Sequence, residues 1–251
     1  MEGTISKWKG MARRSLKGRL GTAMLVTIAV PLMNMLAGVI GASLFPGLDL
    51  LSIILGQVFS FAITLVMSVF SVGMCRMLLK MARREDYSYG DLLYYFRNQP
   101  DRVIWASILM AFISWLTSLP SLVYDYTAST PELPAQITDT ASLQMAELFL
   151  QKQMIYLIIN LGGLVLNMIL TLPFAQTYYI LVDDEEISGM DAVRESFRMM
   201  KGHFGKYILL QLSFLPWMLL FAVTYFLIML WVVPYMEMTN VMFYRELRGE
   251  I

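Results

Sequence analysis

The sequence has little of the chemistry on which common protein sites depend. Its one cysteine, Cys75, cannot form a disulfide within the chain, and with the one histidine, His203, it falls short of an ordinary zinc ligand set. There is no Gly-x-x-x-x-Gly-Lys-Ser/Thr phosphate loop and no His-Glu-x-x-His helix. Lys+Arg and Asp+Glu balance at 19 each, so net charge favours no nucleic-acid partner. These absences predict a protein that is not an enzyme and that needs no metal or cofactor.

Hydrophobic residues, by contrast, are abundant. They make up 57% of the chain, against roughly 45–50% in ordinary soluble domains. Four runs without a charged residue, 20–48, 50–75, 103–124 and 153–182, each reach the roughly 20 residues that cross a bilayer. The sequence therefore predicts an all-α, polytopic membrane helical bundle.

The last hydrophobic region leaves the number of spans open. Residues 207–244 contain one charged residue, Glu237, and are long enough for two spans or for one long span and a surface helix. The count is therefore five or six. Six spans would form three hairpins joined by short cytoplasmic connectors.

Basic residues are segregated along the chain, and this predicts the topology. Six precede the first run within residues 7–19, six lie between 76 and 102, and four lie between 194 and 206. The segment 125–152 holds only Lys152. Because basic residues favour the cytoplasmic side, we expect the N-terminus and both polar connectors to lie inside and the segment 125–152 to lie outside. The sequence thus predicts a multi-pass protein of the cell (plasma) membrane.

The two polar connectors repeat one pattern. "SYGD" places Asp91 three residues after Ser88, and "SGMD" places Asp191 three residues after Ser188. This spacing resembles a capping box, in which two side chains bind free amides at a helix start. Each connector is predicted to hold a short helix in the membrane interface, apolar side down, and the alternative is a solvated loop. The apolar sides would be formed by Leu92, Leu93 and Phe96, and by Val193, Phe197 and Met200.

Matches between other parts of the chain extend this repetition. "KGRLG" at 17–21 parallels "KGHFG" at 201–205, both Lys-Gly-x-x-Gly at the start of a hydrophobic region. "AFISWL" parallels "SFLPWML", and "PFAQTYY" parallels "PYMEMTNVMFY" near the end of such a region. Repeated units of this kind favour three related hairpins over five unrelated helices.

The N-terminus forms a region of its own. Ile5, Trp8, Ala12 and Leu16 make an apolar stripe among six basic residues, which predicts a helix lying on anionic lipid. In the alternative, the charges only set the orientation of the first span. We divide the chain into this basic amphipathic helix, 1–19, and one transmembrane helical domain, 20–247.

The C-terminal third resembles the bacterial domain-of-unknown-function 975 family of integral membrane proteins. The matching features are the acidic pair before Ser-x-x-Asp, "ESFRMMKGH", "LSFLPW" and "PYMEMTNVMFY", and the order of parts agrees over nearly the whole chain. One departure is "FAVTYFLIML" at 221–230, where glycines are frequent in the family, and it concerns the turn between spans five and six. The resemblance implies location and fold and supplies no catalytic residue.

Polar residues within the hydrophobic runs are the candidate site residues. Glu237 stands out, because a carboxylate in hydrocarbon is costly and marks a pathway or a buried pair. Its expected partner is Arg76, and Asn167 and Gln57 complete a predicted intramembrane polar site. The alternative for such residues is interhelical hydrogen bonding.

Two further polar features, the acidic run 183–186 and His203, have simple interpretations. The acidic run 183–186 offers oxygen ligands for a divalent cation, but a solvated run that favours the following helix N-terminus is the simpler interpretation. His203 is expected at the membrane surface beside Lys201 and Lys206, touching lipid headgroups.

These features predict a non-enzymatic envelope protein that organises lipids or partner proteins through its basic cytoplasmic helices. The alternative is a small transporter or exporter of lipid-like or amphiphilic molecules, which would need a polar cavity lined by residues such as Asn167, Gln57 and Glu237. The expected partners are membrane lipids and proteins of unknown identity.

The topology is testable with reporter fusions at Pro134 and at Ile251. We expect the Pro134 fusion to report from outside and the Ile251 fusion from the cytoplasm, because the basic residues lie in connectors predicted to be inside. A signal from outside at Ile251 would rule out six spans.

Overall fold

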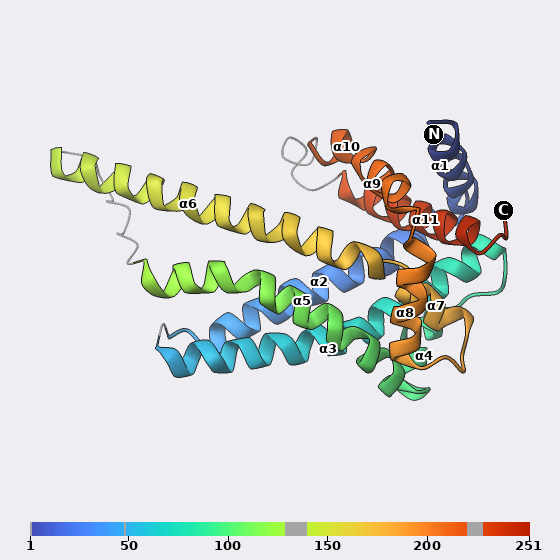
Figure 1. The fold of residues 1–251 in the computed structure, drawn as a ribbon, viewed down its shortest axis with the longest axis horizontal. Helices are drawn as coiled ribbons and strands as arrows, with labels where there is room; N and C mark the ends of the chain where they lie inside the picture. The colour runs from blue at the N-terminus through green and yellow to red at the C-terminus, as the bar shows by residue number, and fades with distance from the viewer. Residues whose placement is uncertain (1, 48, 129–139, 220–227) are drawn as a thin grey trace. The chain divides into compact units, whose positions relative to one another are not determined.

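The computed structural model describes residues 2–47, 49–128, 140–219 and 228–251 (Figure 1). Every regular element in these ranges is a helix. The helices are α1 Glu2–Leu16, α2 Leu20–Leu44, α3 Leu50–Arg83, η1 Tyr89–Leu93, α4 Tyr94–Arg97, α5 Pro100–Thr127, α6 Thr140–Thr171, η2 Leu172–Phe174, α7 Thr177–Asp183, α8 Gly189–Met200, α9 Phe204–Leu212, α10 Leu215–Leu219 and α11 Met229–Leu247.

Four segments of the described chain are long and apolar enough to cross a membrane. They are Leu20–Leu44, Leu50–Arg83, Pro100–Thr127 and Thr140–Asp183, so the four predicted apolar helices are confirmed. At most 28% of the residues in the most apolar part of each segment are buried by the rest of the chain. Lipid or another chain must therefore cover most of their apolar surface.

The predicted fifth and sixth spans are described only in part. The hydrophobic region after Lys206 is divided into α9, α10 and α11, and among the described residues none of these three qualifies as a membrane span by length and composition. The turn expected between spans five and six falls on 220–227, outside the described residues. The six-span arrangement stays a prediction.

The chain divides into two compact units, Met1–Ile108 with Pro173–Ile251, and Leu109–Leu172. The second unit is an antiparallel pair formed by the later part of α5 and by α6. Its helices are joined by polar contacts: the Asn167 amide donates to the Ser114 and Thr117 hydroxyls, both at 3.1 Å, and Ser121 donates to Asn160 at 3.3 Å. Asn167 thus forms the interhelical hydrogen bonds that were the alternative to a polar site.

The first unit is organised around three helix ends. We call the last part of α3, α7 and α11 the returning ends, because each lies at the end of one of the hydrophobic stretches of the chain. The end of α3 packs against both α7 and α11. Tyr179 of α7 stacks on Tyr244 of α11, with ring centroids 5.1 Å apart. The three returning ends together form the core of this unit.

Three short amphipathic segments surround this core, and we call them the docking helices: α1, η1 with α4, and α8. The η1 segment packs on α3, α8 packs on α7, and α1 packs on α11 (Figure 1). Each docking helix therefore covers the returning end that precedes it in the chain, and α1 closes the series by covering the last one. This cyclic order is the structural counterpart of the sequence repetition.

The Lys-Gly-x-x-Gly repeats form matching turns. Gly18 and Gly202 have φ of 80° and 88°, a left-handed conformation that glycine adopts without steric cost. One residue later, the amide of Arg19 donates to Leu16 and the amide of His203 donates to Met200, both at 2.9 Å. The same turn therefore joins α1 to α2 and α8 to α9.

The docking helices direct their apolar residues differently from the prediction. On α1, the side chains of Trp8, Ala12 and Leu16 are buried, so the stripe expected on lipid is covered by protein, chiefly α11. On α8, Val193 and Met200 are buried.

The first connector departs further from the predicted pattern of buried side chains. Asp91 and Tyr95 are its buried residues, whereas Leu93 and Phe96 of the predicted apolar side are exposed. Within η1, the 3-10 period of three residues per turn places Asp91 rather than Leu93 against α3. Tyr95 and Phe96 follow in the single turn of α4.

Close backbone contacts fix two of the docking helices. A Cβ atom at Gly73 of α3 would collide with the backbone carbonyl of Leu92 in η1. A Cβ atom at Gly189 of α8 would collide with the carbonyl of Arg102 and lie 2.8 Å from the nitrogen of Ala106. Only glycine permits these approaches.

We expect Gly73→Ala to lower the stability of the protein by about 1–3 kcal/mol, because the added methyl group meets rigid backbone rather than a flexible side chain. The measurement is thermal unfolding in detergent. The matched control is Gly21→Ala in α2, where nothing lies within 4 Å of the new Cβ. Equal unfolding midpoints for both variants would contradict the close packing of η1 on α3.

Candidate functional site

A row of basic side chains near the end of α3 is the centre of the candidate site. Arg76, Lys80 and Arg83 stand four and three residues apart, so they share one face of the helix. Their partner carboxylates come from η1, from the last residue of α7 and the connection that follows it, and from the C-terminal tail. We call these three residues the α3 basic row.

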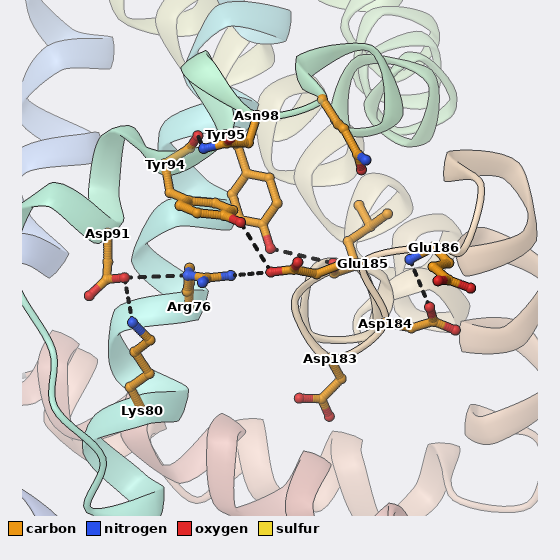
Figure 2. A network of polar contacts seen from close by, with 12 residues as sticks. Arg76, Lys80, Asp91, Tyr94, Tyr95, Asn98, Asp183, Asp184, Glu185 and Glu186 are labelled. Carbon is orange, nitrogen blue, oxygen red and sulfur yellow. Dashed lines mark hydrogen bonds and ion pairs between the residues drawn. The ribbon is translucent and has the colours of Figure 1, made fainter.

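Asp91 of η1 contacts the first two members of the row. One carboxylate oxygen lies 2.7 Å from Lys80 Nζ and 3.3 Å from Arg76 Nε, and the other accepts the amide of Ser88 at 2.8 Å (Figure 2). Burial by itself would raise the pKa of Asp91, but the hydrogen bonds from Lys80 and from the Ser88 amide hold this pKa below its ordinary value. Asp91 is therefore charged at neutral pH and ties η1 to α3.

The acidic run 183–186 supplies the next partners, and we call it the acidic loop. Asp183, the last residue of α7, accepts two hydrogen bonds from Arg83, at 2.6 and 3.0 Å. It also accepts the Tyr244 hydroxyl at 2.6 Å and lies 3.7 Å from Arg248 Nε. Its side chain is only 8% exposed, so this carboxylate is a buried junction between all three returning ends.

Glu185 extends the contacts to the first connector. Its carboxylate accepts Arg76 Nη1 at 3.0 Å and the Tyr94 hydroxyl at 3.2 Å (Figure 2). The hydrogen bond from Arg76 lowers the pKa of Glu185. The Arg76 guanidinium lies over the Tyr94 ring, 3.7 Å from its centroid, a cation–π arrangement. Arg76 thus joins α3 to both the acidic loop and α4.

The backbone of the acidic loop is held as well. Asp184 accepts the amides of Glu186 and Ile187, at 2.9 and 3.0 Å, which closes a tight turn before α8. Arg102 at the start of α5 donates to the carbonyls of Ile187 and Asp184, at 2.7 and 2.6 Å. The loop is therefore fixed at both its side chains and its carbonyl groups.

The C-terminal tail completes the network at the end of α3. Glu250 contacts Arg83 and accepts Arg245 Nε at 2.7 Å. Although burial would raise the pKa of Glu250, the hydrogen bonds from Arg83 and Arg245 keep it below its usual range. Arg245 also donates to the Ala82 carbonyl at 3.0 Å and Arg19 donates to the Met81 carbonyl at 3.2 Å. These guanidinium groups satisfy carbonyls that a helix end leaves free.

The residues of the predicted polar site lie apart in the described structure. Arg76 pairs with Asp91 and Glu185, because the chain after α3 turns back and brings Asp91 to the same helix face, and no ion pair between Arg76 and Glu237 is formed among the described residues. Glu237 lies in α11 and Gln57 lies in the first half of α3, both half-buried. Asn167 belongs to the second unit and bonds across the α5–α6 pair.

The two predicted caps differ in detail. In the first connector the Asp91 carboxylate accepts the Ser88 amide, and Asp91 is buried. In the second the Ser188 hydroxyl accepts the Asp191 amide at 3.1 Å and donates to the exposed Asp191 carboxylate at 2.7 Å. The hydrogen bond from Ser188 is the main cause that lowers the pKa of Asp191. The two sites are therefore unequal, because only Asp91 faces a basic row.

Most of the acidic loop is exposed, as the interpretation of a solvated run predicted, because Asp184, Glu185 and Glu186 all face solvent. Its carboxylates nevertheless have partners within the protein: Asp183 and Glu185 pair with arginines, and Asp184 accepts backbone amides. Within the described residues no three His, Cys, Asp or Glu side chains are grouped to hold a metal ion. The network holds helix ends together.

Sequence reasoning missed the pairing of Arg83 with Asp183 and the participation of Tyr244. A signal was present: the first and last returning ends carry basic residues, and the middle one ends in an acidic run. Complementary ends of repeated units indicate a contact, but only if the units are known to form a closed series.

A family model described as "Protein of unknown function (DUF975)" matches residues 2–250. A search of curated proteins and a search of solved structures each found no match.

We expect Asp183→Asn to destabilise the protein by about 1–3 kcal/mol, because the buried neutral amide no longer offsets the charge of Arg83. The loss is limited, since Arg83 keeps its contact with Glu250 and 25% of its side chain is exposed. Thermal unfolding in detergent measures the effect. The control is Glu186→Gln, which changes an exposed acid of the same loop. If both variants unfold at the same temperature, Asp183 is not a junction.

Proposed function

This chain belongs to the DUF975 family of proteins of unknown function, and we propose that it is a non-enzymatic membrane protein that organises anionic lipids at the cytoplasmic face of the bilayer. It acts as a multi-pass protein of the plasma membrane with a cytoplasmic N-terminus. Its partners are membrane lipids and other proteins, and identifying the lipids and proteins that co-purify with it under gentle conditions would name them.

One observation carries this proposal: α1 buries Trp8, Ala12 and Leu16 of its apolar stripe, and the cations at its C-terminal end are exposed. Trp8 is 1% exposed, packs edge-on against Phe243 at 5.1 Å, and donates to Glu246 at 2.6 Å. Arg13, Arg14 and Lys17 are exposed. A helix anchored in this way presents a fixed basic surface, and each basic residue near an anionic membrane contributes about 1 kcal/mol.

The other charges of the first unit support a structural role. The α3 basic row is paired with carboxylates, so these cations are unavailable to lipid or substrate. The pairs of the candidate site join neighbouring helices. A rigid base of this kind suits a protein that presents a surface rather than one that converts a substrate.

A second candidate function, transport of a lipid-like molecule, is favoured by a groove beside α1. This groove of about 460 Å³ has an apolar wall that includes Leu16, Trp217 and Trp231, and Arg13 and Lys17 stand at it as well. Such a surface fits an amphiphile with an acyl chain and an anionic headgroup. It supports lipid binding under both functions, and movement of lipid across the membrane would separate them.

The experiment compares lipids that co-purify with the full-length protein in mild detergent. We expect the double variant Arg13→Gln/Arg14→Gln to retain less anionic lipid, with affinity lower on the order of tenfold or more. The control double variant, Arg84→Gln/Arg97→Gln, removes two exposed cations outside α1 and should retain the anionic lipid of the unaltered protein. Equal retention by all three proteins would refute the proposal. Transfer of a labelled lipid across proteoliposomes would instead favour the transporter.

A further inference from the structure

A cavity of about 410 Å³ lies beside the turn between α8 and α9. Trp8 and Phe243 form its aromatic side, and Arg198, Lys201, His203 and Lys206 form its basic side. The one acidic residue that lines it is Glu246. The candidate site described above contributes none of these residues.

The cations of this cavity lack firm partners. In the part of the chain that the structure describes, Lys201 and Lys206 form no ion pair or side-chain hydrogen bond. Arg198 approaches only Glu195, at 3.8 Å, with 79% of its own side chain exposed. Exposed pairs of this kind contribute little. This contrasts with the α3 basic row, in which each cation contacts a carboxylate at 3.3 Å or less.

Glu246 does not neutralise the cavity. Its carboxylate accepts the Trp8 indole N–H at 2.6 Å and lies 3.5 Å from Lys7 Nζ. Its charge is therefore already engaged by α1. The cavity keeps an excess of positive charge, which a bound anion would offset.

The backbone adds donors on the same side. α9 begins at Phe204, so the amides of its first turn have no acceptor within the helix, and a helix N-terminus attracts anions. A Cβ atom at Gly205 in this turn would meet no described atom within 4 Å, so the backbone is open to approach. His203 Nδ1 is buried and has no hydrogen-bond partner among the described residues, which leaves a second polar group unsatisfied beside the cavity.

The matching turn between α1 and α2 shows what is specific to this place. There Arg19 takes the position of His203, and its guanidinium donates to the Met81 carbonyl at 3.2 Å. The charged group of Arg19 is therefore engaged by a carbonyl near the end of α3. The α8–α9 turn has the same backbone, but at this position it carries His203, whose Nδ1 has no partner among the described residues.

We propose that this cavity binds a phosphate group, carried by the headgroup of an anionic lipid or by a free phosphate ion. Arg198, Lys201 and Lys206 supply three positive charges, which suit a dianionic phosphate monoester. The inference rests on the proposed function, because it names the chemical group by which the protein would select among anionic lipids.

The test uses the full-length protein and thermal unfolding. Inorganic phosphate is added in detergent, with chloride at matched ionic strength as the control, and phosphatidic acid is added in nanodiscs of neutral lipid. We expect phosphate, phosphatidic acid or both to raise the unfolding temperature, because a ligand bound to the folded state stabilises it. Lys201→Gln/Lys206→Gln should weaken the apparent affinity on the order of tenfold. Arg84→Gln/Arg97→Gln should leave it unchanged.

The outcomes separate the ligand sources and the two proposals. Stabilisation by phosphatidic acid alone assigns the cavity to a lipid headgroup, and stabilisation by phosphate alone assigns it to a soluble ligand. No stabilisation by either, or full stabilisation of Lys201→Gln/Lys206→Gln, overturns the inference. The variant's unfolding temperature without ligand should match that of the unaltered protein, since both side chains are free of ion pairs among the described residues. Loss of lipid in Arg13→Gln/Arg14→Gln with an unresponsive cavity would refute only the cavity.

Discussion

The carboxylate of Asp183 is the point on which the first unit depends. It ends α7, and it contacts Arg83 at the end of α3 and Tyr244 and Arg248 at the end of α11, so the three returning ends meet at one buried charge. Such a charge is stable only when its partners stay in place, because an unpaired buried carboxylate is far more costly than a paired one. The pairing therefore specifies how the helix ends approach one another, beyond what apolar packing would determine.

The docking helices follow from this core. Each docking helix covers one returning end, and a polar contact adds to its apolar burial. Asp91 pairs with the α3 basic row, Arg102 donates to a carbonyl of the connection before α8, and the Trp8 indole donates to Glu246. Because α1 covers α11, the series closes on itself. A closed series leaves none of the three returning ends uncovered.

Charge has two separate uses in this protein. Around α3 and the acidic loop, opposite charges are paired and hold the fold together. On the outer face of α1 and at the α8–α9 turn, cations stand without firm partners among the described residues, and these are the surfaces to which we assign anionic lipid and phosphate. Their positions are fixed by the paired network beneath them, so binding would need little reordering of the protein.

The sequence by itself determined the class of the protein, its four long apolar helices, its short connector helices and its family, because these depend on local composition, periodicity and motifs. The Lys-Gly-x-x-Gly repeats also indicated the matching turns around Gly18 and Gly202. Only the tertiary structure decided which charges pair. By composition alone, Arg76 could pair with Glu237 or with Asp91. After α3 the chain turns back so that Leu92 packs against Gly73, and this packing places Asp91 beside Arg76. The burial of the α1 stripe was likewise undetermined, since an amphipathic helix satisfies its apolar face equally on lipid or on protein until a partner such as α11 is placed beside it.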